Sequence, residues 1–195
     1  HYRLRNTWVR LDTDKAGPEE KRQAKNAGLI SAVGVSLNYD STDHPTSPTR
    51  GFRSKLEQEY AGFWGDTQFL SSAYLNSYYI KAGDKGVVKI RADFRYITPI
   101  FETFRNEIPL DERLFLGGEN TIRGFRSYKI GPEFKETHDP KGGMSMQLYS
   151  IEYNRQIFKR LDAFVFCDSG FLTKYVWQAS RLYTSVGYGV KVTAL

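Results

Sequence analysis

The sequence has 195 residues, enough for one domain with a sizeable core, and 40% of them are hydrophobic. Its net charge of +6 would suit a nucleic-acid-binding protein only if the cations gathered on one face, but they are interspersed with Asp and Glu. One cysteine excludes an intrachain disulfide framework, and no apolar run approaches the ~18 residues of a membrane-spanning helix. The aromatic share of 15% favours strands.

The N-terminal part predicts two strands, a short helix and a turn. Residues 2–11 are rich in Arg, Trp and Val, and Pro18 suits the first turn of a helix over residues 18–25 with a solvated, charged face. Residues 29–39 alternate between apolar and small or polar side chains, which predicts a strand. Residues 40–51 have the composition of a turn.

Two later strands, at residues 52–60 and 88–96, each predict one charged and one apolar face. Their odd-numbered positions hold Arg, Lys, Asp and Glu, whereas their even-numbered positions are mainly aromatic or aliphatic. Between them, residues 68–80 form a long strand rich in Tyr and Ser, followed by a tight turn at residues 81–85. We expect the odd positions to face water. The apolar side chains expected on the opposite side are Phe52, Leu56, Ile90 and Phe94.

Three more alternating strands follow a long unpatterned segment at residues 99–143. A turn near residues 158–160 separates the first two strands, and a loop at residues 170–180 separates the last two. About eight strands are therefore expected, with no helical domain or repeat module. The last three are predicted at residues 144–156, 161–169 and 182–192.

Alternation alone fits either a membrane β-barrel or a soluble β-sandwich. Three features favour the barrel. Several strands reach about ten residues, enough to cross a bilayer when tilted. The polar faces carry both signs of charge, as a water-filled lumen does. Aromatic residues also collect near strand ends, where they would lie at the membrane interface. These residues are Tyr39, Tyr60, Trp64, Tyr79, Tyr153 and Trp177.

The segment at residues 99–143 contains the run Leu116-Gly-Gly-Glu-Asn-Thr-Ile-Arg-Gly-Phe125. A loop this long inside a compact domain is usually either disordered or functional, and its aromatic and aliphatic content argues against disorder. We therefore expect it to fold inward and dock. Its glycines permit tight bends and close backbone approach. They are Gly117, Gly118, Gly124 and Gly131.

This run, with Ile122, Arg123, Gly124 and Phe125 after the Gly117-Gly118 pair, resembles the signature of the BamA-type outer-membrane barrel superfamily. Members of that superfamily insert or secrete β-rich proteins, and their signature forms the tip of an extracellular loop that reaches back into a sixteen-stranded barrel. A second stretch resembles the superfamily's Asp…Asp…Pro-x-x-Gly turn, which is periplasmic. The matching residues are Asp40, Asp43, Pro48 and Gly51.

The resemblance implies that residues 1–195 form about half of such a barrel, with the loop at residues 99–143 extracellular. On this mapping the periplasmic repeats and the terminal strands, which make the superfamily's lateral seam, lie outside the sequence. It also implies an integral protein in the outer membrane of a Gram-negative-type bacterium. The implied partners are the lipid bilayer, nascent β-barrel clients and accessory lipoproteins. It implies no nucleic acid and no cofactor.

The resemblance further implies partners for Arg123 on the two strands after the loop. A buried arginine requires anions, since an unpaired charge at low dielectric is costly. The matching carboxylates are Glu152, in Ile-Glu-Tyr, and Asp168, in Phe-Cys-Asp-Ser-Gly. Both fall on polar strand faces, so they could instead be water-exposed charges of the lumen.

Enzymatic chemistry finds little support in the sequence. No Ser/His/Asp set can be assembled from His1, His44 and His138, which lie at a terminus or in loops. Residues 133–139 could bind a metal weakly, but they are more typical of a solvated loop. Cys167 is either a small lipid-facing side chain or a reactive thiol.

We therefore expect a non-enzymatic outer-membrane β-barrel assembly factor that uses no metal. The alternatives are a protein-secretion pore of the same superfamily and a passive porin-like barrel.

Overall fold

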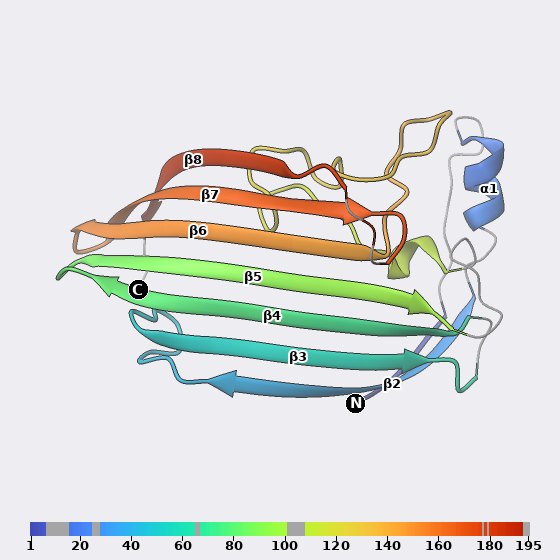
Figure 1. Ribbon diagram of the computed structural model, residues 1–195, viewed down its shortest axis with the longest axis horizontal. Coiled ribbons are helices and arrows are strands. Elements are labelled where there is room, and N and C mark those ends of the chain that lie inside the picture. Colours follow the sequence, from blue (N-terminus) through green and yellow to red (C-terminus); the bar gives the residue numbers. More distant parts are fainter. Residues whose placement is uncertain are drawn as a thin grey trace.

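The structure is a computed structural model, and it describes residues 1–6, 16–24, 28–64, 67–100, 108–176, 178 and 180–192. Figure 1 shows one antiparallel sheet whose eight strands follow one another in sequence order. The strands are β1 (Tyr2–Asn6), β2 (Leu29–Asp40), β3 (Gly51–Ala61), β4 (Phe69–Ala82), β5 (Gly86–Pro99), β6 (Ser145–Phe158), β7 (Leu161–Thr173) and β8 (Tyr183–Val192). The described residues also form the helix α1 (Pro18–Ala24) and the 3-10 helix η2 (Leu110–Glu112). Within the described residues, no helix has the length and apolarity needed to cross a membrane.

The all-β prediction is confirmed, and α1 confirms the short helix. Residues 7–11 of the predicted first strand, residue 25 of the helix and Trp177 lie outside the described residues. One expectation is wrong, because residues 170–173 continue β7 instead of beginning a loop, and they pair with β6. A Cβ on Gly170 would lie 3.2 Å from Cδ1 of Ile122. This glycine therefore allows a close approach inside a strand and does not end it.

The sheet has two distinct faces, and we call the side against which residues 108–143 pack the inner face. The charged rows of β3 and β5 lie on it. Arg3 of β1 donates to Glu59 of β3 at 2.5 Å, and Arg91 of β5 donates to the carbonyl of Asn120 at 3.1 Å. The odd-numbered positions thus share one face in the structure, as their alternation predicts.

The outer face is mainly apolar, with hydrogen-bonded polar pairs at Ser54–Asn76 and Ser72–Gln58. Leu56 and Ile90 are 36% and 38% exposed there, and Val186 and Tyr188 on β8 are 78% and 87% exposed. The Tyr- and Ser-rich strand, whose faces its sequence does not distinguish, joins the same pattern, because Tyr74 of β4 lies opposite Leu56 in the register. A sheet with one largely apolar face cannot leave that face in water without cost.

The core lies between the inner face and residues 108–143, where two apolar clusters form. In the first, Ile108 packs with residues from β2 to β5, including Ile30 and Phe69. In the second, the side chains of the loop pack on β6 and β7. That second cluster comprises Leu116, Ile122, Ile130, Met146, Leu148 and Leu172, each no more than 4% exposed. The loop thus provides core residues to the sheet.

The sheet is open within the part of the chain that the structure describes, since β1 pairs only with β2, and β8 only with β7. We expect residues 1–195, expressed alone and refolded in detergent, not to form a closed native barrel. Lipid leaves the unpaired backbone groups of both edges unsatisfied. Semi-native electrophoresis with and without heating tests this, with the full-length protein as control. A monomeric, protease-resistant and heat-modifiable species made from this chain alone would contradict the expectation.

The face assignment makes a second prediction for the full-length protein, using two adjacent residues of β3. Leu56→Arg places a cation on the outer face and is expected to cost roughly 2 to 4 kcal/mol if that face contacts the bilayer. Lys55→Leu removes an inner-face cation that pairs with Glu57 at 2.6 Å, and is expected to cost little. Reversible urea unfolding in lipid vesicles measures both changes. Equal tolerance of the two substitutions would rule out an outer face in lipid.

Candidate functional site

The loop tip is a tight turn built on two glycines. Gly117 and Gly118 have φ angles of 106° and 103°, a region that costs side-chain-bearing residues energy. A Cβ on Gly117 would also lie 2.6 Å from the carbonyl oxygen of Arg126. The amide of Gly117 donates to the Thr121 hydroxyl at 2.9 Å, and the amide of Gly118 donates to the carbonyl of Ile122 at 3.2 Å. Hydrogen bonds within the tip thus stabilise the turn in addition to its contacts with the sheet.

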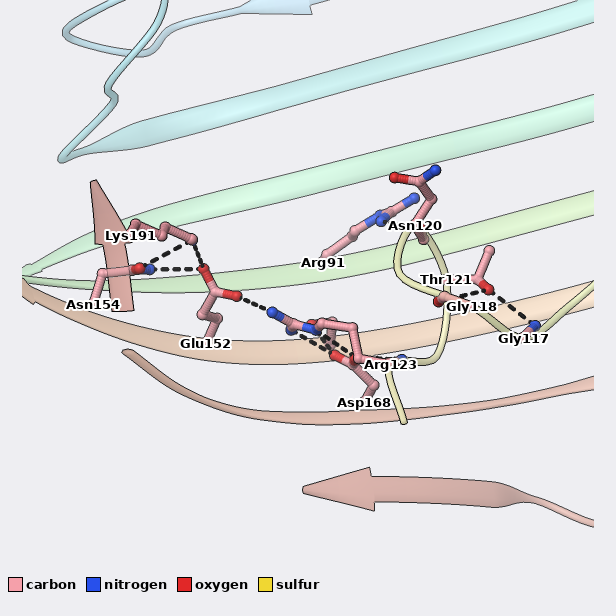
Figure 2. Close-up of polar contacts among 11 residues, drawn as sticks. Arg91, Gly117, Gly118, Asn120, Thr121, Arg123, Glu152, Asn154, Asp168 and Lys191 are labelled. Carbon is pink, nitrogen blue, oxygen red and sulfur yellow. Dashed lines mark hydrogen bonds and ion pairs between the residues drawn. The ribbon is translucent and has the colours of Figure 1, made fainter. Parts of the chain in front are cut away.

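Two side chains of the motif place the tip on the inner face. Ile122 is fully buried in the apolar cluster on β6 and β7. Phe125 packs edge-on against Tyr183 of β8, with ring centroids 5.9 Å apart. Between them, Gly124 has a φ of 85°, so the chain turns immediately after Arg123. As a result the Arg123 side chain points along the inner face (Figure 2).

The Arg123 guanidinium lies between two carboxylates. Its Nε donates to Oδ2 of Asp168 at 2.8 Å and its Nη2 donates to Oδ1 at 2.9 Å, which is the two-pronged geometry that suits a planar fork. The Arg123 amide also donates to Asp168, at 3.1 Å. On the other side, Nη1 donates to Oε2 of Glu152 (Figure 2). Asp168 is 1% exposed and Glu152 7%, so both carboxylates are buried where the arginine meets them.

Three further side chains donate hydrogen bonds to the same two carboxylates. The hydroxyl of Ser150 donates to Asp168 at 2.6 Å. Lys191 of β8 and the amide of Asn154 donate to Oε1 of Glu152 at 2.6 and 2.9 Å (Figure 2). Two cations therefore meet two carboxylates. Such a balanced, hydrogen-bonded set avoids the cost of a stranded buried charge.

Aromatic rings line the remaining side of the arginine. The Cζ atom of Arg123 lies 3.6 Å from the ring centroid of Phe166, a cation–π contact. Across the sheet Phe166 faces Gly187 of β8, and Phe164 faces Gly189. A Cβ at Gly187 would lie 2.6 Å from the Phe166 ring, so these glycines leave room for the rings.

A model of the Omp85 superfamily domain matches residues 1–194. The chain belongs to the Omp85 superfamily. It is 29% identical over 145 residues to outer membrane protein assembly factor BamA of Nitratidesulfovibrio vulgaris, covering 73% of this chain and 18% of that protein. It is 28% identical over 195 residues to BamA of Neorickettsia risticii, covering 92% of this chain and 25% of that protein. A SAM50-like protein of Schizosaccharomyces pombe is 28% identical over 142 residues, covering 71% of this chain and 29% of that protein.

The fold is similar to the crystal structure of BamA from Haemophilus ducreyi lacking POTRA domains 1–3. The TM-score is 0.75 at 19% sequence identity, and the match covers 85% of this chain and 37% of that chain. The eight-stranded sheet therefore has the fold of the BamA barrel. The chain spans between 18% and 29% of the length of these curated relatives.

The predicted turn motif of this Omp85 chain lies between β2 and β3, at the end of the sheet opposite to the one where the loop leaves β5 and joins β6 (Figure 1). Asp43 accepts hydrogen bonds from the amides of Thr49 and Arg50 at 2.7 and 3.1 Å, and from the Thr49 hydroxyl. Asp40 accepts a hydrogen bond from the amide of Thr42 at 2.9 Å. Pro48 lies within this turn, and Gly51, with φ of 108°, ends it. These four residues build one turn and do not contact the Arg123 site among the described interactions.

Several residues of the Arg123 site were not found from the sequence. Ser150, Asn154 and Lys191 lie on inner-face positions of β6 and β8, so alternation places them on the correct side but does not identify their partners. No sequence pattern pointed to Arg113, at the base of the loop. It is 4% exposed and donates to the carbonyl of Ile108 at 2.9 Å and to Gln23 of α1 at 2.8 Å. This residue ties the loop base to α1.

Other candidate chemistry is dispersed. Among the described residues no cluster of three or more His, Cys, Asp or Glu side chains could hold a metal ion. Cys167 is exposed on the outer face and lies opposite Ile151 in the register. His138 lies 3.6 Å from a Glu133 carboxylate oxygen in a loop, with its side chain 77% exposed.

The turn motif makes a pH prediction. The pKa of Asp43 is lowered to about 2, because the Thr49 hydroxyl and then the Arg50 and Thr49 amides donate hydrogen bonds to its carboxylate. A carboxyl with a lower pKa in the folded state contributes stability above its unfolded-state pKa, and this contribution is lost as pH falls through the folded value. The turn should therefore stay protected down to about pH 4 and loosen as the pH falls to about 2.

Hydrogen exchange at the amides of Thr49 and Arg50, corrected for the intrinsic pH dependence, measures this loss. Asp43→Asn should remove the pH dependence in that window. Asp84→Asn, in the turn between β4 and β5 at the same end of the sheet, is the matched control and should keep the parent profile. Equal protection of the parent turn at pH 4 and pH 2 would contradict the prediction.

Proposed function

We propose that this chain forms part of the barrel domain of an outer-membrane β-barrel assembly factor, which inserts other β-barrels into the outer membrane of a Gram-negative-type bacterium. The observation that carries the proposal is the Arg123 cluster, a loop cation held by Asp168 and Glu152 on the inner face of a membrane-type sheet. Two relatives are named outer membrane protein assembly factors, which supports the same function. The function needs no bond to be made or broken, and we propose a non-enzymatic role without cofactor or metal.

In this proposal the inner face lines the barrel lumen, and Arg123 docks the extracellular loop inside it. The docked motif touches several strands: Glu152 belongs to β6, Asp168 to β7, and Tyr183, which packs on Phe125, to β8. A loop fastened to neighbouring strands resists their separation. An insertase that opens at a seam between other strands needs this part of the wall to keep its shape.

The partners follow from the two faces. The exposed apolar side chains of the outer face would contact the lipid bilayer, where aliphatic and aromatic side chains are stable. Nascent β-barrel proteins would be the clients, and accessory lipoproteins would complete the machine. The number of periplasmic repeats in the full-length sequence separates insertase from secretion pore: several repeats favour an insertase, whereas two favour a secretion pore.

Arg123→Ala in the full-length protein should lower both barrel stability and client insertion. Removing one member of a buried, hydrogen-bonded charge set costs about 3 to 5 kcal/mol, because the remaining carboxylates lose their counter-charge. Arg123→Lys should restore part of the loss, since an ammonium ion cannot reproduce the two-pronged contact with Asp168. Arg126→Ala, an exposed arginine three residues further along the loop, is the matched control.

Stability is measured by urea unfolding in vesicles, and insertion by the rate at which a small β-barrel client becomes heat-modifiable in vesicles containing each variant. The proposal expects both quantities to fall for Arg123→Ala and to stay near the parent for Arg126→Ala. A folded Arg123→Ala protein that inserts the client at the parent rate would refute a role for Arg123 in insertion, and a parent protein that does not accelerate insertion would refute the assembly function. Loss of partner export with unchanged client insertion would assign the chain to a secretion pore.

A further inference from the structure

Arg91 and Asp93 form an ion pair on the inner face of β5 that the Arg123 cluster does not use. The Nε and Nη2 atoms of Arg91 donate to the same oxygen of Asp93, at 2.8 and 2.5 Å. Two donors on one acceptor fix the plane of the guanidinium and leave Nη1 pointing away. That atom donates to the backbone carbonyl of Asn120 in the loop tip at 3.1 Å.

The register places this pair directly beside the Arg123 cluster. Arg91 of β5 lies opposite Ser150 of β6, and Ser150 lies opposite Asp168 of β7. These three residues form one row across the sheet, and the loop tip contacts both ends of it. Asn120 meets the β5 end through Arg91, and Arg123 meets the β7 end through Asp168 (Figure 2).

The burial of Asp93 links the pair to the docked loop. Asp93 is 2% exposed and lies opposite Leu148, a fully buried residue of the cluster that packs against the loop. A carboxylate this deeply buried is costly unless a cation meets it. Arg91 therefore does two things at once: it compensates Asp93 and it contacts the tip.

We propose that Arg91, oriented by Asp93, is a second positioning residue that holds the loop tip on β5 through the Asn120 carbonyl. The Arg123 cluster, Ile122 and Phe125 all hold the C-terminal part of the tip on β6, β7 and β8, and none of them holds its N-terminal part on β5. A second contact three residues earlier in the tip, on a different strand, fixes its orientation. Because the acceptor is a backbone carbonyl, the side chain at position 120 is free to vary.

The inference rests on the proposed docking of the loop, and one experiment separates the two. A nitroxide label at Asn120→Cys, in a Cys167→Ser background, reports tip mobility without removing the carbonyl, since the Asn120 side chain is exposed. The full-length protein is studied in lipid vesicles by electron paramagnetic resonance. Arg91→Ala and Asp93→Asn should each raise the ratio of mobile to immobile label about tenfold, the effect of losing one hydrogen bond to a charged group. Arg91→Lys should raise it less.

Arg95→Ala is the matched control, because Arg95 lies on the same strand and face and its Nε has no hydrogen-bond partner among the described residues. It should leave the label near the parent state. Arg123→Ala should mobilise the label. If Arg123→Ala mobilises the tip but Arg91→Ala and Arg91→Lys do not, the second contact is refuted and the docking stands. If Arg123→Ala has no effect either, the docking itself fails. Equal mobilisation by Arg91→Ala and Arg95→Ala would also overturn the inference, since it would reflect lost charge alone.

Discussion

The Arg123 side chain is 23% exposed between the loop and the sheet, and its guanidinium must be matched by carboxylates that are themselves buried. Asp168 and Glu152 meet it from neighbouring strands, so the contact requires β6 and β7 to be paired in one register. A shift of one strand by one residue would turn its carboxylate to the outer face and leave Arg123 with only one of its two partners. The loop position, the sheet register and the charge balance of the inner face therefore depend on one another.

The inner face of β6 changes character along its length, and this change determines where the loop lies. Met146 and Leu148 are apolar, Ser150 is neutral and polar, and Glu152 and Asn154 follow. Each part of the loop meets its chemical counterpart: aliphatic side chains cover the apolar end, and the arginine begins where the carboxylates begin. The sequence of a single strand thus specifies the depth to which the loop can dock.

Much of this arrangement could be read from the sequence, because alternation has a period of two and reports faces directly. Strand positions and the faces of the charged rows follow from it, and the pairing of Arg123 with Glu152 and Asp168 comes from the resemblance of the motifs. The contact from Arg91 to Asn120 could not be predicted, since a backbone carbonyl has no sequence signature. Gly170 was predicted to end a strand, because glycine is typical of loops. In the structure it lies inside β7, where the absence of a side chain lets Ile122 approach.

Apolar contacts and charges make different contributions to the docked loop. Burying an aliphatic side chain contributes about 1.5 to 3 kcal/mol, so Leu116, Ile122 and Ile130 supply most of the attraction between loop and sheet. That attraction has no direction, and an aliphatic cluster would tolerate sliding by a fraction of a residue. The two-pronged contact with Asp168 does not, because its donors lose alignment within about an ångström. The apolar residues therefore hold the loop down, while Arg123 determines the one position in which it rests.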